Sequence, residues 1–341
     1  MMLRRLAAVP LILIALLLIA MYSTQVPYAG FRQPVYVDIP RGTGSRGIAA
    51  LLERNGVIRY RWQFLLARVL RPRVTLQAGE YLFEQPASPW RVLERLAYGD
   101  VFYHELVVHE GDNTFDIAAA LEAQGILPAA AFLEASRDAS LVRDLDPGAP
   151  SLEGYLFPDT YWVTRRTTPA RLCRMMTGRF RRAWRELGSP KAGIHDTVTL
   201  ASLVEEEAKL PQERPLIASV FLNRLRAGVA LQCDPTAIYA ALLEARYRGA
   251  IHRSDLDRRQ AYNTYQYPGL PPGPIANPGL ASLRAALHPA QTDYLYFVLR
   301  ADGSASHQFS SNLAEHTRAV QEYRRELHNQ AQQAHGAARV R

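Results

Sequence analysis

Three consecutive glutamates stand at the end of an apolar segment, residues 200–208 (LASLVEEEA). At 100° per residue the apolar positions of this segment form one stripe, as in an amphipathic helix. Glu207 falls within the stripe, Glu205 lies at its edge, and Glu206 points away toward solvent. A carboxyl at such an edge is partly desolvated, which raises its pKa and suits it to donate a proton near neutral pH. The periodicity does not choose between Glu205 and Glu207, and a plain helix with three surface glutamates is the alternative.

A glycine-rich turn, residues 42–47 (GTGSRG), matches the G-x-G-x-x-G pattern of dinucleotide-binding proteins. The acidic residue expected about 20 positions later is absent. A second copy of the same segment carries Gly111, Asn113 and Asp116 at the equivalent positions, so the pattern indicates a turn. We therefore expect no cofactor.

Metal-ligand patterns are also missing. The nine histidines show no H-E-x-x-H or H-x-x-E-H spacing, and the two cysteines, Cys173 and Cys233, are too few for a cysteine-based zinc module. We expect no metal site. Cys233 has no adjacent histidine base, which favours a small buried residue or a disulfide with Cys173 over a nucleophile.

An internal repeat lies upstream of the glutamates. Residues 48–56 (IAALLERNG) align with residues 117–125 (IAAALEAQG) at an offset of 69 positions, and the match extends to residues 79–83 (GEYLF) and 153–157 (EGYLF). Each copy predicts a strand, a turn, a helix ended by glycine, a second helix and a strand. The first copy resembles the LysM module, which implies glycan binding, with a structural spacer as the alternative.

The amino terminus resembles a membrane anchor. Arg4 and Arg5 precede an uncharged run, residues 6–22, which as a helix would reach about 26 Å. No small-x-small cleavage site follows, which favours an uncleaved anchor over a signal peptide. The positive-inside rule then predicts a single-pass protein of the inner (cytoplasmic) membrane, with a cytoplasmic amino terminus and a periplasmic body.

The composition fits two globular domains, since 48% of the 341 residues are hydrophobic and 21% are charged. The net charge of +8 comes from scattered basic residues, so nucleic acid is not an expected partner. We predict an α+β fold with a single transmembrane helix (1–22), a small LysM-like α+β domain (23–105), a larger mixed α/β catalytic domain with the second repeat (106–330) and a frayed tail (331–341). A long helical region is expected from Thr197, then a turn-rich stretch (263–278), a strand (294–298) and a polar helix.

Several blocks of the chain resemble, in order, those of the YceG-like family of endolytic murein transglycosylases. They are LEGYLFPDTY (152–161), LASLVEEEA (200–208), ASVFLNRL (218–225), LQCDPTAIY (231–239), YNTY (262–265), GLPPGPIANPG (269–279), ALHP (286–289), YLYFV (294–298) and HQFSSNLAEH (307–316).

This resemblance implies cleavage of the β-1,4 bond between N-acetylmuramic acid and N-acetylglucosamine within nascent peptidoglycan strands, leaving 1,6-anhydro ends and terminating glycan elongation. The glutamate of the family pattern A-S-x-x-E maps onto Glu205, which implies that Glu205 is the catalytic acid. Where this chain has Glu206 the family often has a basic residue, and where it has Cys233 a small polar one.

The resemblance also gives candidate substrate-binding residues in the family-like blocks: Gln232, Asn263, Tyr265, Glu153 and His307. Cell-wall synthesis proteins are the implied protein partners. Asp234 precedes a proline and is expected to cap a helix. Two alternatives remain: a hydrolytic muramidase with Glu153 as second carboxylate, and a non-catalytic glycan-binding scaffold for cell-wall synthesis.

Overall fold

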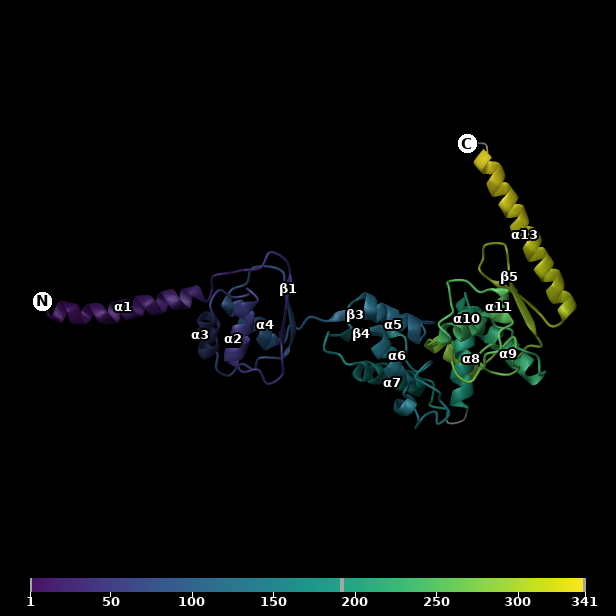
Figure 1. The fold of residues 1–341 in the computed structure, drawn as a ribbon, viewed down its shortest axis with the longest axis horizontal. Helices are drawn as coiled ribbons and strands as arrows, with labels where there is room; N and C mark the ends of the chain where they lie inside the picture. Colours follow the sequence, from purple (N-terminus) through teal and green to yellow (C-terminus); the bar gives the residue numbers. More distant parts are fainter. Residues whose placement is uncertain (1, 191–192, 340–341) are drawn as a thin grey trace. The chain divides into compact units, whose positions relative to one another are not determined.

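The structure is a computed structural model that describes the backbone of residues 2–190 and 193–339 and the side chains of residues 11–190, 193–330 and 332. The chain divides into two compact units (Figure 1). The first comprises Met1–Glu105 and Trp162–Arg166, and the second comprises Leu106–Tyr161 and Thr167–Arg341. The LysM-like character of the first unit stays a prediction.

The amino-terminal part of the chain contains the first repeat and the helices before and after it. Its elements are α1 (Met2–Ser23), β1 (Val35–Ile39), α2 (Ser45–Arg54), α3 (Arg61–Leu70), β2 (Gly79–Phe83) and α4 (Pro89–Tyr98). The second repeat and the helix after it contain β3 (His104–Val108), α5 (Thr114–Ala123), α6 (Ala129–Arg137), the 3-10 helix η1 (Ala139–Leu141), β4 (Asp159–Val163) and α7 (Pro169–Glu186). The remainder contains α8 (Ile194–Glu207), the 3-10 helix η2 (Pro211–Glu213), α9 (Arg214–Arg226), α10 (Asp234–Leu243), α11 (Arg253–Leu256), α12 (Leu280–Leu287), β5 (Tyr296–Leu299), β6 (His307–Ser310) and α13 (Leu313–Arg339).

The predicted membrane anchor is wrong. Over the part of the chain that the structure describes, no helix combines the length and the apolar character needed to cross a bilayer. Such a helix needs about 20 predominantly apolar residues, and the described side chains of α1 begin only at Leu11. Residues 6–10 of the predicted span lie outside the described side chains. This finding overturns the transmembrane helix in the predicted fold class and the single-pass inner-membrane localisation that rested on it.

The first repeat folds as a strand, two helices and a strand. β1 and β2 pair antiparallel, with Val37 opposite Tyr81. Alternate strand residues face a core that also receives Leu52 from α2 and Phe64 from α3, all of them fully buried. The order of elements follows the predicted pattern, because period-2 strands and period-3.6 helices each need one apolar face to pack.

The second repeat departs from the predicted alignment. β3, α5, α6 and β4 follow in the expected order, and Asn113 caps α5 by accepting hydrogen bonds from the amides of Phe115 and Asp116. Residues 153–157 do not form a strand, however: residues 153–155 form a turn, and the strand β4 begins only at Asp159. The backbone there does not fit a strand, since Gly154 has a left-handed φ of 84°.

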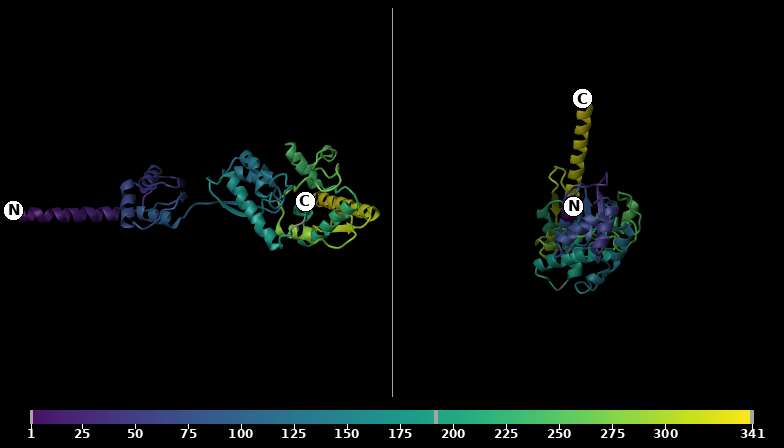
Figure 2. Two further views of the ribbon diagram at one scale, coloured as in Figure 1. Left: turned by 90° about the horizontal axis from the view of Figure 1, so that it is seen from below. Right: turned by 90° about the vertical axis from the view of Figure 1, so that its left-hand side faces the viewer.

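The core of the second unit is built around α8, which packs against α9 and α12. Leu203 and Val204 of α8 are fully buried beside Ile217 and Phe221 of α9. β5 and β6 pair antiparallel, with Phe297 opposite Phe309. Helix α13 follows this pair as one long helix, seen from further sides in Figure 2. The predicted helical region, strand and closing polar helix are therefore present. For the predicted frayed tail (331–341), the structure describes the backbone as far as residue 339 and the side chain of residue 332 alone.

Candidate active site

The three glutamates occupy the last turn of α8 and meet three different environments. Successive residues of a helix point about 100° apart, so the three side chains point in different directions. Glu205 contacts the starts of α9 and α12, Glu206 faces the turn before α5, and Glu207 faces the residue that caps α10. Their chemistry is therefore set by different segments of the fold.

Glu205 is a buried, fully engaged carboxylate. Arg214 Nη2 donates to its Oε1 at 2.8 Å, and the amide of Gly279 donates to its Oε2 at 2.8 Å. Its side chain is 4% exposed and that of Arg214 is 11% exposed. Arg214 also donates to Ser282 Oγ at 2.9 Å. Both oxygens of Glu205 thus act as acceptors in contacts that join α8 to α9 and α12.

Glu206 does not lie on a solvated face, as the periodicity predicted, but is half-buried. Burial raises the pKa of Glu206 to about 7, and the carboxylates of Asp116, Glu205 and Glu207 add to the effect. A Cβ built on Gly111 would come within 3.0 Å of Glu206 Oε1. Glu206 therefore packs against the second repeat.

Glu207 lines a cavity of about 280 Å³. Among the described residues, the one hydrogen bond to its carboxyl comes from Cys233 Sγ, which donates to Oε1 at 3.3 Å. Burial raises the pKa of Glu207, and the Cys233 hydrogen bond opposes this rise. Burial also raises the pKa of the Cys233 thiol well above its usual range, so the sulfur keeps its proton and acts as a donor. Glu207 therefore presents a carboxyl of raised pKa to a cavity.

Two of the predicted substrate-binding residues, Gln232 and Tyr265, lie in the same cavity. Gln232 adopts a left-handed φ of 51°, and its backbone amide donates to the Thr264 carbonyl at 3.2 Å. The Tyr265 hydroxyl donates to Asp234 Oδ1. Asp234 also lines the cavity, and it is the first residue of α10 rather than its cap, which is Cys233. The cavity thus gathers acidic, amide and phenol groups around Glu207.

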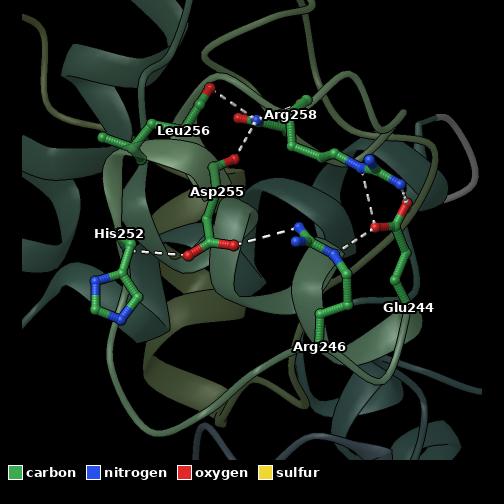
Figure 3. Close-up of polar contacts among 7 residues, drawn as sticks. Glu244, Arg246, His252, Asp255, Leu256 and Arg258 are labelled. Atoms are coloured by element: carbon green, nitrogen blue, oxygen red, sulfur yellow. Dashed lines mark hydrogen bonds and ion pairs between the residues drawn. The ribbon is translucent and has the colours of Figure 1, made fainter.

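Asn263 is fully buried, does not line the cavity, and binds the backbone of residues 255–258 instead. Its Nδ2 donates to the carbonyls of Asp255, Leu256 and Arg258 at 2.8 to 3.0 Å. Figure 3 shows Asp255, Leu256 and Arg258 together with Glu244, whose carboxyl pairs with Arg258 and with Arg246. Since Asn263 Oδ1 accepts from the Tyr265 amide at 3.0 Å, this network fixes the backbone that carries Tyr265.

Glu153 is also removed from the cavity and is 1% exposed. Its Oε2 accepts from the amide and hydroxyl of Thr114 and from the Tyr239 hydroxyl at 2.8 to 3.0 Å, and its Oε1 accepts from Asn277 Nδ2 at 2.9 Å. Burial raises the pKa of Glu153 to about 7, against these hydrogen bonds. Its partners are internal donors of the fold.

His307 likewise contacts the protein itself. Its Nδ1 lies 2.7 Å from Glu213 Oε2, and its amide donates to Glu213 Oε1 at 2.8 Å. Both side chains are less than a tenth exposed. The two cysteines, Cys173 and Cys233, are free and buried, so they do not form the disulfide considered from the sequence. No group of side chains within the described ranges is arranged to hold a metal ion.

Sequence reasoning missed three residues of the cavity wall: Arg224, Tyr296 and His316. Arg224 follows the buried Val220 by four positions. That spacing places an arginine on the buried face of α9, which is a usable signal because lone buried charges are rare. No comparable spacing distinguishes His316.

A model of the YceG-like family matches residues 37–322. The chain belongs to the YceG-like family. Its cavity and its three glutamates lie within the matched residues.

Two relatives of this YceG-like chain are named endolytic murein transglycosylase. A Bacillus subtilis (strain 168) protein named endolytic murein transglycosylase is 33% identical over an alignment of 309 positions that covers 85% of this chain and 84% of the relative. A Streptococcus pneumoniae protein of the same name is 28% identical over 86% of this chain, but the match spans only 59% of that longer relative. The crystal structure of a yceG-like protein from Listeria monocytogenes superposes with a TM-score of 0.55 at 30% identity, over 84% of this chain and 99% of that one.

Proposed function

We propose that the chain is an endolytic murein transglycosylase that cleaves within peptidoglycan strands, and that Glu207 is its proton donor. The relatives named for this activity, which cover most of the chain, support the reaction. The observation that supports the donor is that Glu207 is the one glutamate of the α8 triplet that lines the cavity with Gln232 and Tyr265. Glu205, the donor implied by the family resemblance, accepts hydrogen bonds at both oxygens from protein groups.

The environment of Glu207 suits a general acid. Burial favours the neutral carboxyl, and Cys233 occupies only Oε1. Glu207 donates its proton to the glycosidic oxygen as the bond from C1 of the muramyl residue breaks. The leaving sugar departs with that proton as a new hydroxyl.

The same residue then completes the reaction as a base. The Glu207 carboxylate accepts the proton of the muramyl C6 hydroxyl while that oxygen bonds to C1, which closes the 1,6-anhydro ring. The proton balance is restored and no water is consumed. The attacking hydroxyl belongs to the sugar already bound, so proximity favours it over water. Asp234, the other carboxylate of the cavity, supports the positive charge that develops on the sugar.

Paired variants test the donor. We expect Glu207→Gln to lower cleavage of purified glycan strands at least about a hundredfold, the usual contribution of general acid catalysis, with an unchanged unfolding temperature. Glu205→Gln weakens a buried ion pair, so we expect a lower unfolding temperature while the folded fraction still cleaves strands. Strand cleavage by chromatography and thermal unfolding are measured on the same full-length preparations. Cleavage that survives in Glu207→Gln and disappears in folded Glu205→Gln would return the role to Glu205.

A further inference from the structure

Arg224 is a cavity residue that the reaction described above does not use. It extends from α9, and its Nε and Nη1 donate to the carbonyls of Leu295 at 2.8 Å and Leu231 at 2.6 Å. Its guanidinium carbon lies 5.1 Å from the centre of the Tyr296 ring. These contacts fix the position of the cation and use two of the five N–H donors of an arginine.

The charge of Arg224 has no acidic partner among the described side chains. Arg224 is half-buried, and this burial lowers its pKa. A buried charge is costly unless it is paired. Arg214, at the start of the same helix α9, has such a partner in Glu205. Arg224 is thus a half-buried cation in the wall of the cavity that Glu207 also lines.

The neighbouring side chain does not supply the missing anion. His316 stacks on the ring of Tyr296, with centres 5.0 Å apart and planes 19° apart. Its Nδ1 is buried and has no hydrogen-bond partner among the described residues. Burial and the charge of Arg224 both lower the pKa of His316, which keeps the imidazole neutral. His316 therefore adds no anion to this wall, and Arg224 has no ion-pair partner among the described side chains.

We propose that Arg224 binds a carboxylate of the muramyl substituent and thereby determines which glycan strands the cavity accepts. This inference rests on the proposed function, because it takes the cavity as the place where the strand is held. N-acetylmuramic acid differs from N-acetylglucosamine by a lactyl ether. Its carboxylate is free in strands without stem peptides and is an amide in strands that carry them, where the peptide supplies carboxylates of its own. A guanidinium held in place by two carbonyls can receive either carboxylate through its remaining N–H groups.

The test compares ligands as well as variants. The affinity of full-length Glu207→Gln protein, with and without Arg224→Gln, is measured by calorimetry for three strands. These are strands stripped of stem peptides, strands that carry them, and stripped strands whose lactyl carboxylates have been converted to methylamides. We expect Arg224→Gln to weaken binding of a carboxylate strand about tenfold or more, and to change binding of the methylamide strand less than about twofold. Loss with stripped strands assigns the lactyl carboxylate as the ligand, and loss only with peptide-bearing strands assigns the stem peptide.

A structural role of Arg224 would give a different result. Loss of the two carbonyl contacts would weaken all three ligands equally, and equal losses, or no loss with either carboxylate strand, would overturn the proposal. Arg224→Lys keeps the charge and should restore part of the preference for carboxylate strands. Arg226→Gln is the matched control, because Arg226 lies two residues further along α9, is exposed, and contacts Asn223 Oδ1. Strand cleavage in the Glu207→Gln samples would refute the proposed donor, whereas the ratio of affinities between ligands reports on Arg224 alone.

Discussion

At the scale of single residues, the chemistry of three adjacent glutamates depends on their partners. Arg214 and Gly279 engage Glu205, the carboxylate of Asp116 acts on Glu206, and Cys233 donates to Glu207. Arg214 lies nine residues from Glu205, and the other partners come from segments more distant in sequence. The thiol of Cys233 is the feature closest to the proposed proton donor, and a sulfur is a weak hydrogen-bond donor.

The pH dependence of cleavage should respond to Cys233. Its hydrogen bond favours the charged form of Glu207 and so lowers the pKa of that carboxyl, while burial and Asp234 raise it and His307 and Lys209 lower it. A general acid must be protonated, so activity is lost as the pH rises through its pKa. Cys233→Ala removes the donor, and the alkaline limb of the pH profile should move to higher pH. Cys233→Thr supplies a stronger donor, and the limb should move to lower pH.

Rates for both variants at their optimum should stay within about tenfold of the original, since the proton donor is retained. The measurement is the initial rate of strand cleavage from pH 5 to 9. Limbs that coincide in all three proteins would show that Cys233 does not act on the proton donor.

At the scale of elements, the contact between Arg214 and Glu205 holds together the helices that form the site. It joins the end of α8 to the start of α9, while the Gly279 amide joins α8 to the residue that precedes α12. These three helices pack against one another, and α8 carries Glu207 at its last position. The geometry of the proton donor therefore depends on this buried ion pair.

Removal of the Arg214 cation should destabilise the folded protein. Arg214→Met leaves the buried Glu205 carboxylate without its partner, and we expect the free energy of unfolding to fall by about 3–5 kcal/mol. Denaturant unfolding followed by circular dichroism measures the change. Arg226→Gln, on the exposed side of the same helix, should change it by less than about 0.5 kcal/mol. A loss below about 1 kcal/mol for Arg214→Met would mean that the pair contributes little to holding α8.

At the scale of the whole molecule, local patterns predicted the order of elements, while the choices that depend on distant contacts were not predictable. The strand and helix periods of the sequence predicted the order of strands and helices in both repeats and the helix α8. Residues 79–83 and 153–157 have nearly the same letters, yet only the first is a strand, since Glu153 is held by Thr114, Tyr239 and Asn277. Likewise, periodicity predicted a carboxyl at the edge of α8, but not which glutamate would face the cavity.

The stability of the whole chain should depend on pH through Glu206. Burial raises the pKa of Glu206 to about 7 in the folded protein, above its ordinary value of 4.5, so the folded state binds the proton more tightly. The resulting stability is present below about pH 4.5 and is lost as the pH rises toward and through 7, by up to about 3 kcal/mol. Glu206→Gln keeps a neutral side chain at all pH values. The unfolding temperature of this variant should therefore fall less between pH 5 and pH 8 than that of the original chain, and equal falls would contradict the assignment.

The central claim is that a single carboxyl of this cavity cleaves the strand without water. Its most direct test is mass spectrometry of the ends formed when full-length protein digests purified, uncrosslinked glycan strands in water enriched in oxygen-18. The account predicts internal fragments of mixed length with 1,6-anhydro ends, each lighter by one water than a hydrolysed fragment and free of the heavy isotope. Reducing ends that carry oxygen-18 would contradict it and identify a muramidase.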